Sequence, residues 1–185
     1  MGFLSALSSI FGVGKRSCHI VVVGLDNAGK STILNALRNE ETRVSQVVPT
    51  VGMTVTQFTG TGVNFSAFDM SGQGKYRGLW DSYYSKAEGI MFVVDSTDKL
   101  RMSVARDELW MIIDHKDCRK VPILIMANKS DKPEAMTLDE VSLHLGMCIA
   151  EFGRISITLN SPLSGNGIPQ SLEWLSKSVK EFLDG

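Results

Sequence analysis

The chain has 185 residues, of which 43% are hydrophobic and 21% are charged, and its formal net charge is -1. This length and balance predict a globular domain with one core, and the near-neutral charge argues against nucleic acid as a partner, since domains that bind it carry a basic patch. Three scattered cysteines without C-x-x-C spacing favour reduced thiols and a cytoplasmic protein, and no apolar run reaches the roughly 18 residues of a membrane span.

The first predicted element is an amphipathic helix within residues 1–16, ahead of a domain that we place at 17–185. Its apolar residues share one helical face, and two basic residues follow them. They are Phe3, Leu4, Leu7, Ile10 and Phe11. Such a face is typical of a helix that lies in a lipid interface, although it could instead pack on the domain. Gly2 does not complete a myristoylation signal, because Ala6 stands where Ser or Thr is required.

A phosphate-binding motif follows the first predicted strand, 18–23, and opens a predicted helix over 29–38. It is the run Gly24-Leu25-Asp26-Asn27-Ala28-Gly29-Lys30-Ser31, a complete G-x-x-x-x-G-K-[ST]. A strand that turns into a helix through two glycines directs backbone N–H groups and the positive end of the helix dipole at one point. Because a lysine completes this cradle, the motif predicts a site for the β- and γ-phosphates of a nucleotide.

The later segments alternate between strands and helices, which predicts an α/β fold with a mostly parallel sheet covered by helices on both faces. Segments 53–58 and 63–68 flank a Thr-Gly-Thr-Gly turn and are expected to form an antiparallel hairpin. Segments 89–94 and 122–127 are continuous apolar runs, as in central strands. We further expect helices over 103–114, 138–145 and 168–182, and a strand over 155–159. The prediction is therefore a sheet of about six strands, one of them antiparallel, with about five helices after the N-terminal segment.

A second motif follows the predicted strand 63–68. Residues Asp69 to Gln73 match D-x-x-G-Q, in which the aspartate holds Mg²⁺ through water, the Gly72 N–H meets the γ-phosphate and the glutamine orients the attacking water. Thr50 lies in a loop before the hairpin, where a threonine can close on Mg²⁺ and the γ-phosphate. These residues predict a site that responds to the third phosphate.

A third motif, Asn128-Lys129-Ser130-Asp131, follows the predicted strand 122–127 and matches N-K-x-D. A carboxylate at its end accepts two N–H bonds from guanine, a pair that adenine cannot offer. Such discrimination is worth orders of magnitude, because the wrong base leaves a buried polar group unpaired. The three motifs together predict that the chain binds GTP/GDP and Mg²⁺.

The set G-L-D-N-A-G-K-S, P-T-V-G, D-x-x-G-Q, Y-R-x-L-W and N-K-x-D resembles the Arf and Arf-like branch of small GTPases over essentially the whole chain. Within that branch, residues 68–77 and 96–102 look most like the subfamily that recruits a coat complex, the BBSome, to ciliary membranes. The resemblance implies a P-loop small-GTPase fold and a cytoplasmic protein that associates reversibly with membranes, at the cilium or basal body. It also implies an exchange factor and an activating protein, neither of which the sequence identifies.

The same resemblance assigns roles to individual residues. Nucleotide contacts fall on Gly24, Leu25, Asp26, Asn27, Ala28, Gly29, Lys30, Ser31, Thr32, Thr50, Gly72, Asn128, Lys129, Asp131, Leu159 and Asn160. Ser31 and Thr50 are the expected ligands of Mg²⁺, with Asp69 acting through water, and Gln73 is the expected catalytic glutamine.

The chain departs from the family pattern at two places. Relatives carry a Ser/Cys-Ala-x turn whose main-chain N–H meets guanine, and the matching stretch is expected at Thr158-Leu159-Asn160, with a bulky Leu159 at the alanine position. Ser71 replaces a glycine just before Gly72, which is expected to restrict the conformations of that loop.

The partner surface is expected beside the D-x-x-G-Q motif. In the family, effectors contact three aromatic residues that come from the hairpin and from the two segments that respond to the third phosphate. Met53, Phe68 and Tyr83 occupy those positions here. The full set expected to contact a GTP-state effector, a BBSome-like coat complex, is Met53, Phe68, Tyr76, Leu79, Trp80 and Tyr83. The alternative for the aromatic rings after Gln73, which recur at helical spacing, is that they pack in the core.

Hydrolysis is expected to be slow without a partner, since the segment before Thr50 holds only Arg43, which we interpret as a solvated loop charge. An arginine supplied by a partner is worth on the order of 10³–10⁵ in rate. Two alternatives remain open: a GTP-binding scaffold with negligible hydrolysis, and a P-loop kinase, which would need a lid that carries arginines.

Overall fold

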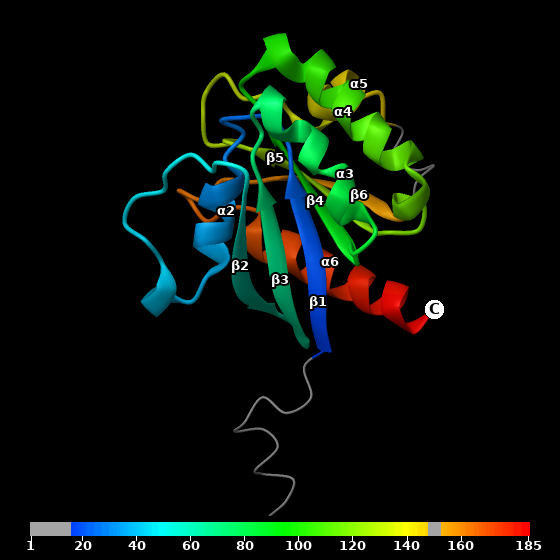
Figure 1. The fold of residues 1–185 in the computed structure, drawn as a ribbon. Coiled ribbons are helices and arrows are strands. Elements are labelled where there is room, and N and C mark those ends of the chain that lie inside the picture. The colour runs from blue at the N-terminus through cyan, green and yellow to red at the C-terminus, as the bar shows by residue number, and fades with distance from the viewer. Residues whose placement is uncertain (1–15, 148–152) are drawn as a thin grey trace, which may run out of the picture.

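The computed structural model describes residues 16–147 and 153–185. Its centre is a six-stranded sheet in the order β2-β3-β1-β4-β5-β6 (Figure 1). The strands are β1 (Arg16–Val23), β2 (Met53–Gly60), β3 (Val63–Met70), β4 (Gly89–Asp95), β5 (Ile123–Asn128) and β6 (Ile155–Leu159). Every neighbouring pair is parallel except β2 and β3, which form the antiparallel hairpin. The predicted fold class is thereby confirmed.

Helices cover both faces of the sheet. They are α2 (Lys30–Leu37), α3 (Asp81–Tyr84), α4 (Met102–Asp114), α5 (Leu138–His144) and α6 (Ile168–Asp184). Figure 1 shows α6 on the side of the sheet opposite to α3 and α4. Short 3₁₀ helices add η1 (Glu40–Thr42), η2 (Gly74–Leu79), η3 (Lys99–Arg101) and η4 (Lys116–Cys118). Within the described residues, no helix has both the length and the hydropathy to cross a bilayer.

The apolar runs of the central strands account for the two hydrophobic cores. In β1, Val21 and Val23 pack with α4 and α5 on one face, while Ile20 and Val22 pack with α2 and α6 on the other. All four side chains are fully buried. A strand covered on both faces needs apolar residues at every position, which is why the sequence shows a continuous run rather than an alternation. This central strand leads directly into the phosphate-binding motif.

The strands and long helices lie within a few residues of their predicted bounds, whereas η2 and α3 were not expected. Between them, η2 and α3 occupy most of the segment that follows the D-x-x-G-Q motif. The predicted N-terminal amphipathic helix, with Phe3, Leu4, Leu7, Ile10 and Phe11, lies outside the described residues.

Candidate functional site

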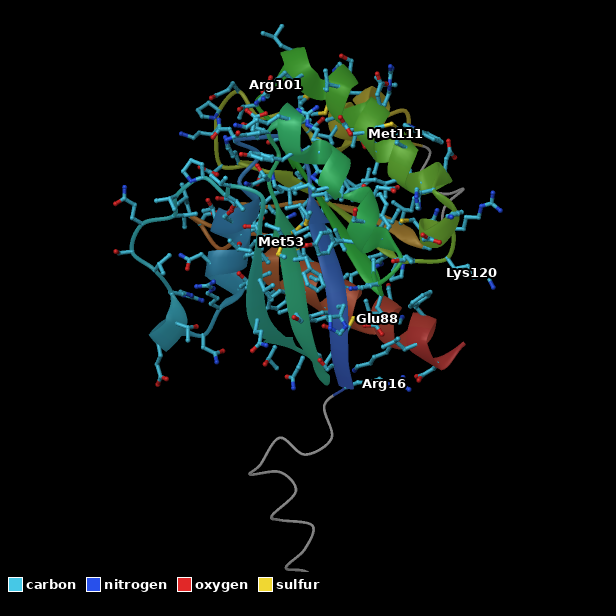
Figure 2. The ribbon with its side chains drawn as sticks, in the orientation of Figure 1. Arg16, Met53, Glu88, Arg101, Met111 and Lys120 are labelled. Carbon is cyan, nitrogen blue, oxygen red and sulfur yellow. The ribbon has the colours of Figure 1, made fainter. Side chains whose placement is uncertain are left out.

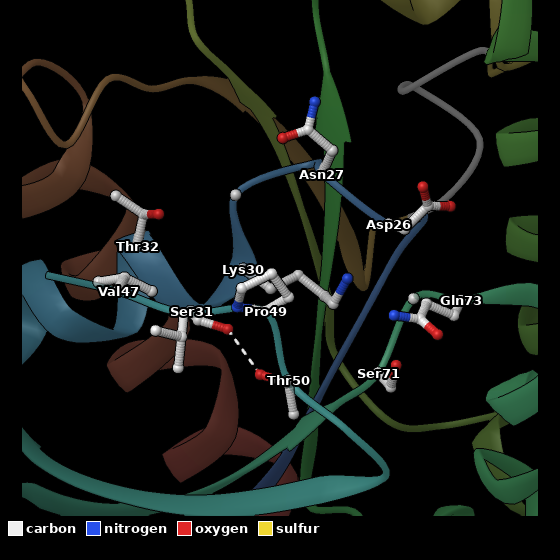
Figure 3. Close-up of a pocket in the computed structure, with 13 residues that line it drawn as sticks. Asp26, Asn27, Lys30, Ser31, Thr32, Val47, Pro49, Thr50, Ser71 and Gln73 are labelled. Carbon is white, nitrogen blue, oxygen red and sulfur yellow. Dashed lines mark hydrogen bonds between the residues drawn. The ribbon is translucent and has the colours of Figure 1, made fainter.

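A cavity of about 470 Å³ lies at the carboxyl edge of the sheet, at the end of β1. Three segments that are distant in sequence form its walls: the phosphate-binding motif, the loop before β2 and the turn after β3. Its lining comprises Asp26, Asn27, Gly29, Lys30, Ser31, Thr32, Val47, Val48, Pro49, Thr50, Ser71, Gly72 and Gln73 (Figure 3). The structure therefore brings together most of the predicted phosphate and Mg²⁺ contacts.

The motif turns into α2 through Gly29, which has a left-handed backbone with φ 93°. A Cβ at this position would lie 2.1 Å from the side-chain nitrogen of Asn128, so only glycine fits. No side chain caps the start of α2, which leaves the first N–H groups of the helix available to a ligand. Uncapped amides at a helix N-terminus that lines a cavity form an anion site.

Lys30 is the buried cation of this cavity and is only 6% exposed. Its Nζ donates hydrogen bonds to the carbonyl oxygens of Gly24 and Leu25, both at 2.9 Å. Burial lowers the pKa of Lys30 to about 8, and the nearby carboxylates of Asp69 and Asp26 oppose that shift. A buried ammonium is stabilised by anions, so this position suits the charge of bound phosphates.

Three oxygen-bearing side chains converge next to Lys30. Ser31 Oγ and Thr50 Oγ1 lie 2.9 Å apart (Figure 3), and they donate to Asp69 Oδ2 at 2.6 and 3.2 Å. Burial raises the pKa of Asp69, and the hydrogen bond from Ser31 is the largest effect that opposes this shift. Within the described part of the chain, the second Asp69 oxygen is buried without a partner. Hydroxyl and carboxylate oxygens are the ligands that Mg²⁺ prefers, so this set fits that ion.

The turn after β3 lies directly against the phosphate-binding motif. The Asp26 N–H donates to the Gly72 carbonyl at 3.1 Å, and a Cβ on Gly72 would lie 2.3 Å from the Asp26 nitrogen. Gln73 is partly buried at the edge of the cavity. Ser71 is 2% exposed, and its hydroxyl has no partner among the described residues. A shift of this turn therefore changes the cavity itself.

The N-K-x-D residues form a loop beside the phosphate-binding motif and do not line the cavity. Asn128 donates from its side-chain nitrogen to the Ala28 carbonyl at 2.8 Å, which joins the two loops. Lys129 has φ 62° and pairs with Asp95, with Nζ 2.6 Å from Oδ2. Asp131 is exposed, and no residue of 16–147 or 153–185 forms a hydrogen bond or ion pair with its carboxylate.

Asn160 lies behind this loop rather than facing a ligand. It is fully buried, its N–H donates to the Ala127 carbonyl at 2.8 Å, and its carbonyl accepts from Ser130 N at 3.1 Å. Its side chain bonds to Thr158 and Ser171. A main-chain N–H of the Thr158-Leu159-Asn160 turn was expected to meet guanine, and the structure shows that the N–H of Asn160 is already engaged. Leu159 is 37% exposed at the end of β6.

Two arginines that the sequence did not point to meet at the phosphate-binding motif. Arg101 Nη1 lies 3.1 Å from Asp26 Oδ1, and Arg77 Nη2 lies 3.8 Å from the same atom. Arg43, by contrast, donates to the Ala36 and Arg38 carbonyls at the end of α2. Both arginines lie in segments that carry the family resemblance. They follow Asp26 by 51 and 75 positions, however, so only the folded chain shows that they contact it.

The predicted effector surface is present in part. Phe68 and Tyr83 have ring centroids 5.3 Å apart, and both side chains, like Met53 on β2, are partly buried (Figure 2 labels Met53). Leu79 is 43% exposed. Trp80, however, was wrongly expected to contact a partner: it is 2% exposed, and its indole nitrogen donates to the Ser71 carbonyl at 3.1 Å. Its side chain packs in the core, and its hydrogen bond to Ser71 holds the turn after β3 in place.

Comparisons with known proteins agree with this geometry. The model of the ADP-ribosylation factor family matches residues 3–179. The chain is 48% identical to ADP-ribosylation factor-like protein 6 of Caenorhabditis elegans over 186 aligned residues, covering 100% of this chain and 98% of the relative. The protein of the same name from Danio rerio is 36% identical, over 97% and 98%. The structure of the Arl6 BBS3 small GTPase from Trypanosoma brucei with bound nucleotide analogue GppNp has a TM-score of 0.80 at 34% identity, covering 89% of this chain and 98% of that chain.

Proposed function

This chain belongs to the ADP-ribosylation factor family of small GTPases, and on that premise we propose that it is a GTP/GDP switch that recruits a coat complex to membranes and hydrolyses GTP slowly. Membership confirms the resemblance inferred from the motifs, and with it the GTPase activity and the use of GTP/GDP and Mg²⁺. The observation that carries the proposal is the convergence of Ser31, Thr50 and Asp69 on one point of the cavity.

The switch follows from the elements that supply these residues. Ser31 belongs to α2 and Asp69 to β3, whereas Thr50 and the neighbouring Gly72 belong to loops that line the same cavity. We assign Ser31 and Thr50 as the Mg²⁺ ligands, with Asp69 acting through water. Bound Mg²⁺ would neutralise charge on the β- and γ-phosphates. A γ-phosphate would favour the position in which both loops face α2, and its loss would release them.

The phosphates are assigned to the backbone of Asp26–Thr32 and to Lys30. The backbone N–H groups at the start of α2 would donate hydrogen bonds to the anionic phosphate oxygens, and the Lys30 ammonium would exchange its carbonyl partners for phosphate. Gln73 is assigned the task of orienting the attacking water. The partly buried amide at the edge of the cavity supports this role.

Guanine recognition is assigned to the loop after β5. The exposed Asp131 carboxylate has no partner in the described chain, so it can accept the two N–H bonds of guanine. Asn128 acts by tying this loop to the phosphate-binding motif, and Lys129 is held in place by Asp95. The base and phosphate sites are thus mechanically joined.

Slow hydrolysis is inferred from the arginines near the cavity. Arg77 and Arg101 are engaged with carboxylates, and Arg43 caps α2. None of these three arginines is therefore free to stabilise the charge of the transition state, and an activating partner is expected to supply one, worth on the order of 10³–10⁵ in rate. Single-turnover GTP hydrolysis by the pure chain tests this inference. A turnover on the order of one per second without a partner would contradict it.

Recruitment of a coat complex is inferred from the relatives and from the surface beside Gly72. Met53, Phe68 and Tyr83, with Tyr76 and Leu79 nearby, lie next to the turn that responds to the γ-phosphate. The resemblance of residues 68–77 and 96–102 to the subfamily that recruits the BBSome is the basis for proposing a BBSome-like coat complex and a location at the cilium or basal body, and the similarity to ADP-ribosylation factor-like protein 6 is in keeping with it. The test is binding of the purified coat complex to immobilised chain. Binding should require GppNp, and equal binding with GDP would exclude recruitment by the GTP state.

A further inference from the structure

Asp26 carries the one acidic side chain of the phosphate-binding motif, and two guanidinium groups meet at it. Arg101 makes two contacts, from Nη1 to Asp26 Oδ1 at 3.1 Å and from Nη2 to the Asp26 carbonyl at 3.2 Å. Arg77 Nη2 lies 3.8 Å from the same carboxylate oxygen. Figure 2 shows Arg101 beside the start of α4.

Both arginines are fixed from behind by other carboxylates. Arg101 Nε donates to Asp98 Oδ2 at 2.6 Å, and this hydrogen bond is the main cause of its raised pKa. Arg77 donates to Glu108 on α4 at 2.9 Å and to the Gly72 carbonyl at 3.0 Å. Because η3 and α4 anchor these contacts, the Asp26 side chain is held toward α4.

A carboxylate in this position opposes the binding of phosphates. Asp26 lines the cavity, so its negative charge lies near the place assigned to the β- and γ-phosphates. Coulomb repulsion grows with the charge of the ligand, and GTP carries one more phosphate than GDP. An uncompensated Asp26 would therefore penalise GTP more than GDP, and the switch would be biased toward its inactive state.

We propose that Arg101, assisted by Arg77, is a positioning residue that neutralises Asp26 and holds it toward α4, and that it thereby sets the preference of this site for GTP over GDP. The proposal rests on the proposed placement of the phosphates in this cavity. Arg101 acts through Asp26 and not by contact with the phosphates. It enters from η3, outside the three nucleotide motifs.

The test is a double-mutant cycle on the full chain, read as the dissociation constants of GppNp and GDP in the presence of Mg²⁺. Arg101→Gln should weaken the binding of GppNp about two- to fivefold more than the binding of GDP, as expected for one partly exposed charge pair. In the Asp26→Asn background the same substitution should leave the ratio of the two constants unchanged. Arg106→Gln is the matched control, because Arg106 lies on the exposed side of α4 and pairs with Asp107.

Three results would overturn the proposal. The first is an equal effect of Arg101→Gln on the binding of both nucleotides, and the second is an effect that persists in the Asp26→Asn background. Slower hydrolysis of GTP with unchanged binding constants would also overturn it, since Arg101 would then act on the transition state. The phosphate placement is tested separately by Ser31→Asn. If Ser31→Asn binds GppNp as the parent chain does, the proposed function fails. If Ser31→Asn weakens GppNp binding as expected but the double-mutant cycle gives one of the contradicting results, only the role of Arg101 is refuted.

Discussion

Asn128 donates its side-chain amide to the main-chain oxygen of Ala28 at 2.8 Å, so the loop that is expected to select the base is bonded to the motif that is expected to hold the phosphates. The amide is 2% exposed, and its oxygen has no partner in the described chain. A buried hydrogen bond of this kind fixes the distance between the two halves of the nucleotide site. The first prediction follows from this contact.

Asn128→Ala is expected to weaken the binding of GDP and of GppNp by the same factor. Loss of the bond leaves the Ala28 carbonyl unpaired and no longer holds the base and phosphate halves of the site in register. If this ordering must be restored on binding, at a cost of up to about 1–3 kcal/mol, affinity falls by up to roughly 5- to 150-fold. Dissociation of a fluorescent GDP analogue measures the effect. Asn64→Ala, at an exposed position of β3, is the control, and a selective loss of GppNp binding alone would contradict the prediction.

Gly72→Ala is expected to impair the response to GTP more than the binding of GDP. A Cβ at this position would lie 2.3 Å from both the Asp26 nitrogen and the Leu25 carbonyl carbon, so the turn must move away from the motif. Overpacking of this kind costs about 1–3 kcal/mol. Gly74→Ala is the matched control, because nothing lies within 4 Å of its added Cβ. Equal GppNp affinities for the two variants would refute the assigned position of this turn.

Gln73→Leu is expected to slow hydrolysis by at least about 10²-fold while GTP affinity changes little. The side chain lies at the edge of the cavity and is assigned to the water rather than to the phosphates. Single-turnover hydrolysis and equilibrium titration with GppNp measure the two quantities separately. A loss of affinity in step with the loss of rate would assign Gln73 to binding instead.

The pair between Lys129 and Asp95 predicts a pH dependence of stability. Burial acts to raise the pKa of Asp95, but hydrogen bonds from Lys129 and Thr97 outweigh it, and the net pKa is lowered. A carboxyl whose pKa is lower in the folded state stabilises the fold above its unfolded pKa of about 3.9, and that contribution is lost as the pH falls through the folded value.

Asp95→Asn should therefore reduce the free energy of unfolding at neutral pH by about 1.5–3 kcal/mol, and the difference from the parent chain should shrink toward about pH 3. Urea denaturation at both pH values measures it. Asp107→Asn, in an exposed pair with Arg106, is the control and should change stability little. A difference that grows on acidification would contradict the sign of the shift.

Sequence reasoning predicted the strands well because the central ones are buried on both faces. Runs such as 20–23 and 90–94 have no polar position, and only a covered strand accommodates that composition. The motifs were predicted to meet because parallel strands end at the same edge, and the cavity gathers Lys30, Thr50 and Gly72 there. The local sequence pattern was therefore sufficient to predict those strands and turns whose burial or backbone geometry depends on neighbouring residues in the chain.

Features that depend on contacts between distant segments were not predicted. The 3₁₀ helix η2 and the short α3 are held by Trp80 against Ser71 and by Arg77 against Glu108, and neither contact leaves a periodic signal. For the same reason Trp80 was expected on the surface and lies in the core. The arginine contacts with Asp26 also bridge long stretches of chain, which spacing alone does not show.

The central claim, that bound GTP moves this chain onto membranes, is tested most directly by flotation of the full chain with liposomes. The apolar face formed by Phe3, Leu4, Leu7, Ile10 and Phe11 is the expected anchor, and five apolar residues give reversible binding. Chain loaded with GppNp is expected to float with the liposomes, and chain loaded with GDP is expected to stay in solution. Equal flotation in both nucleotide states would contradict it.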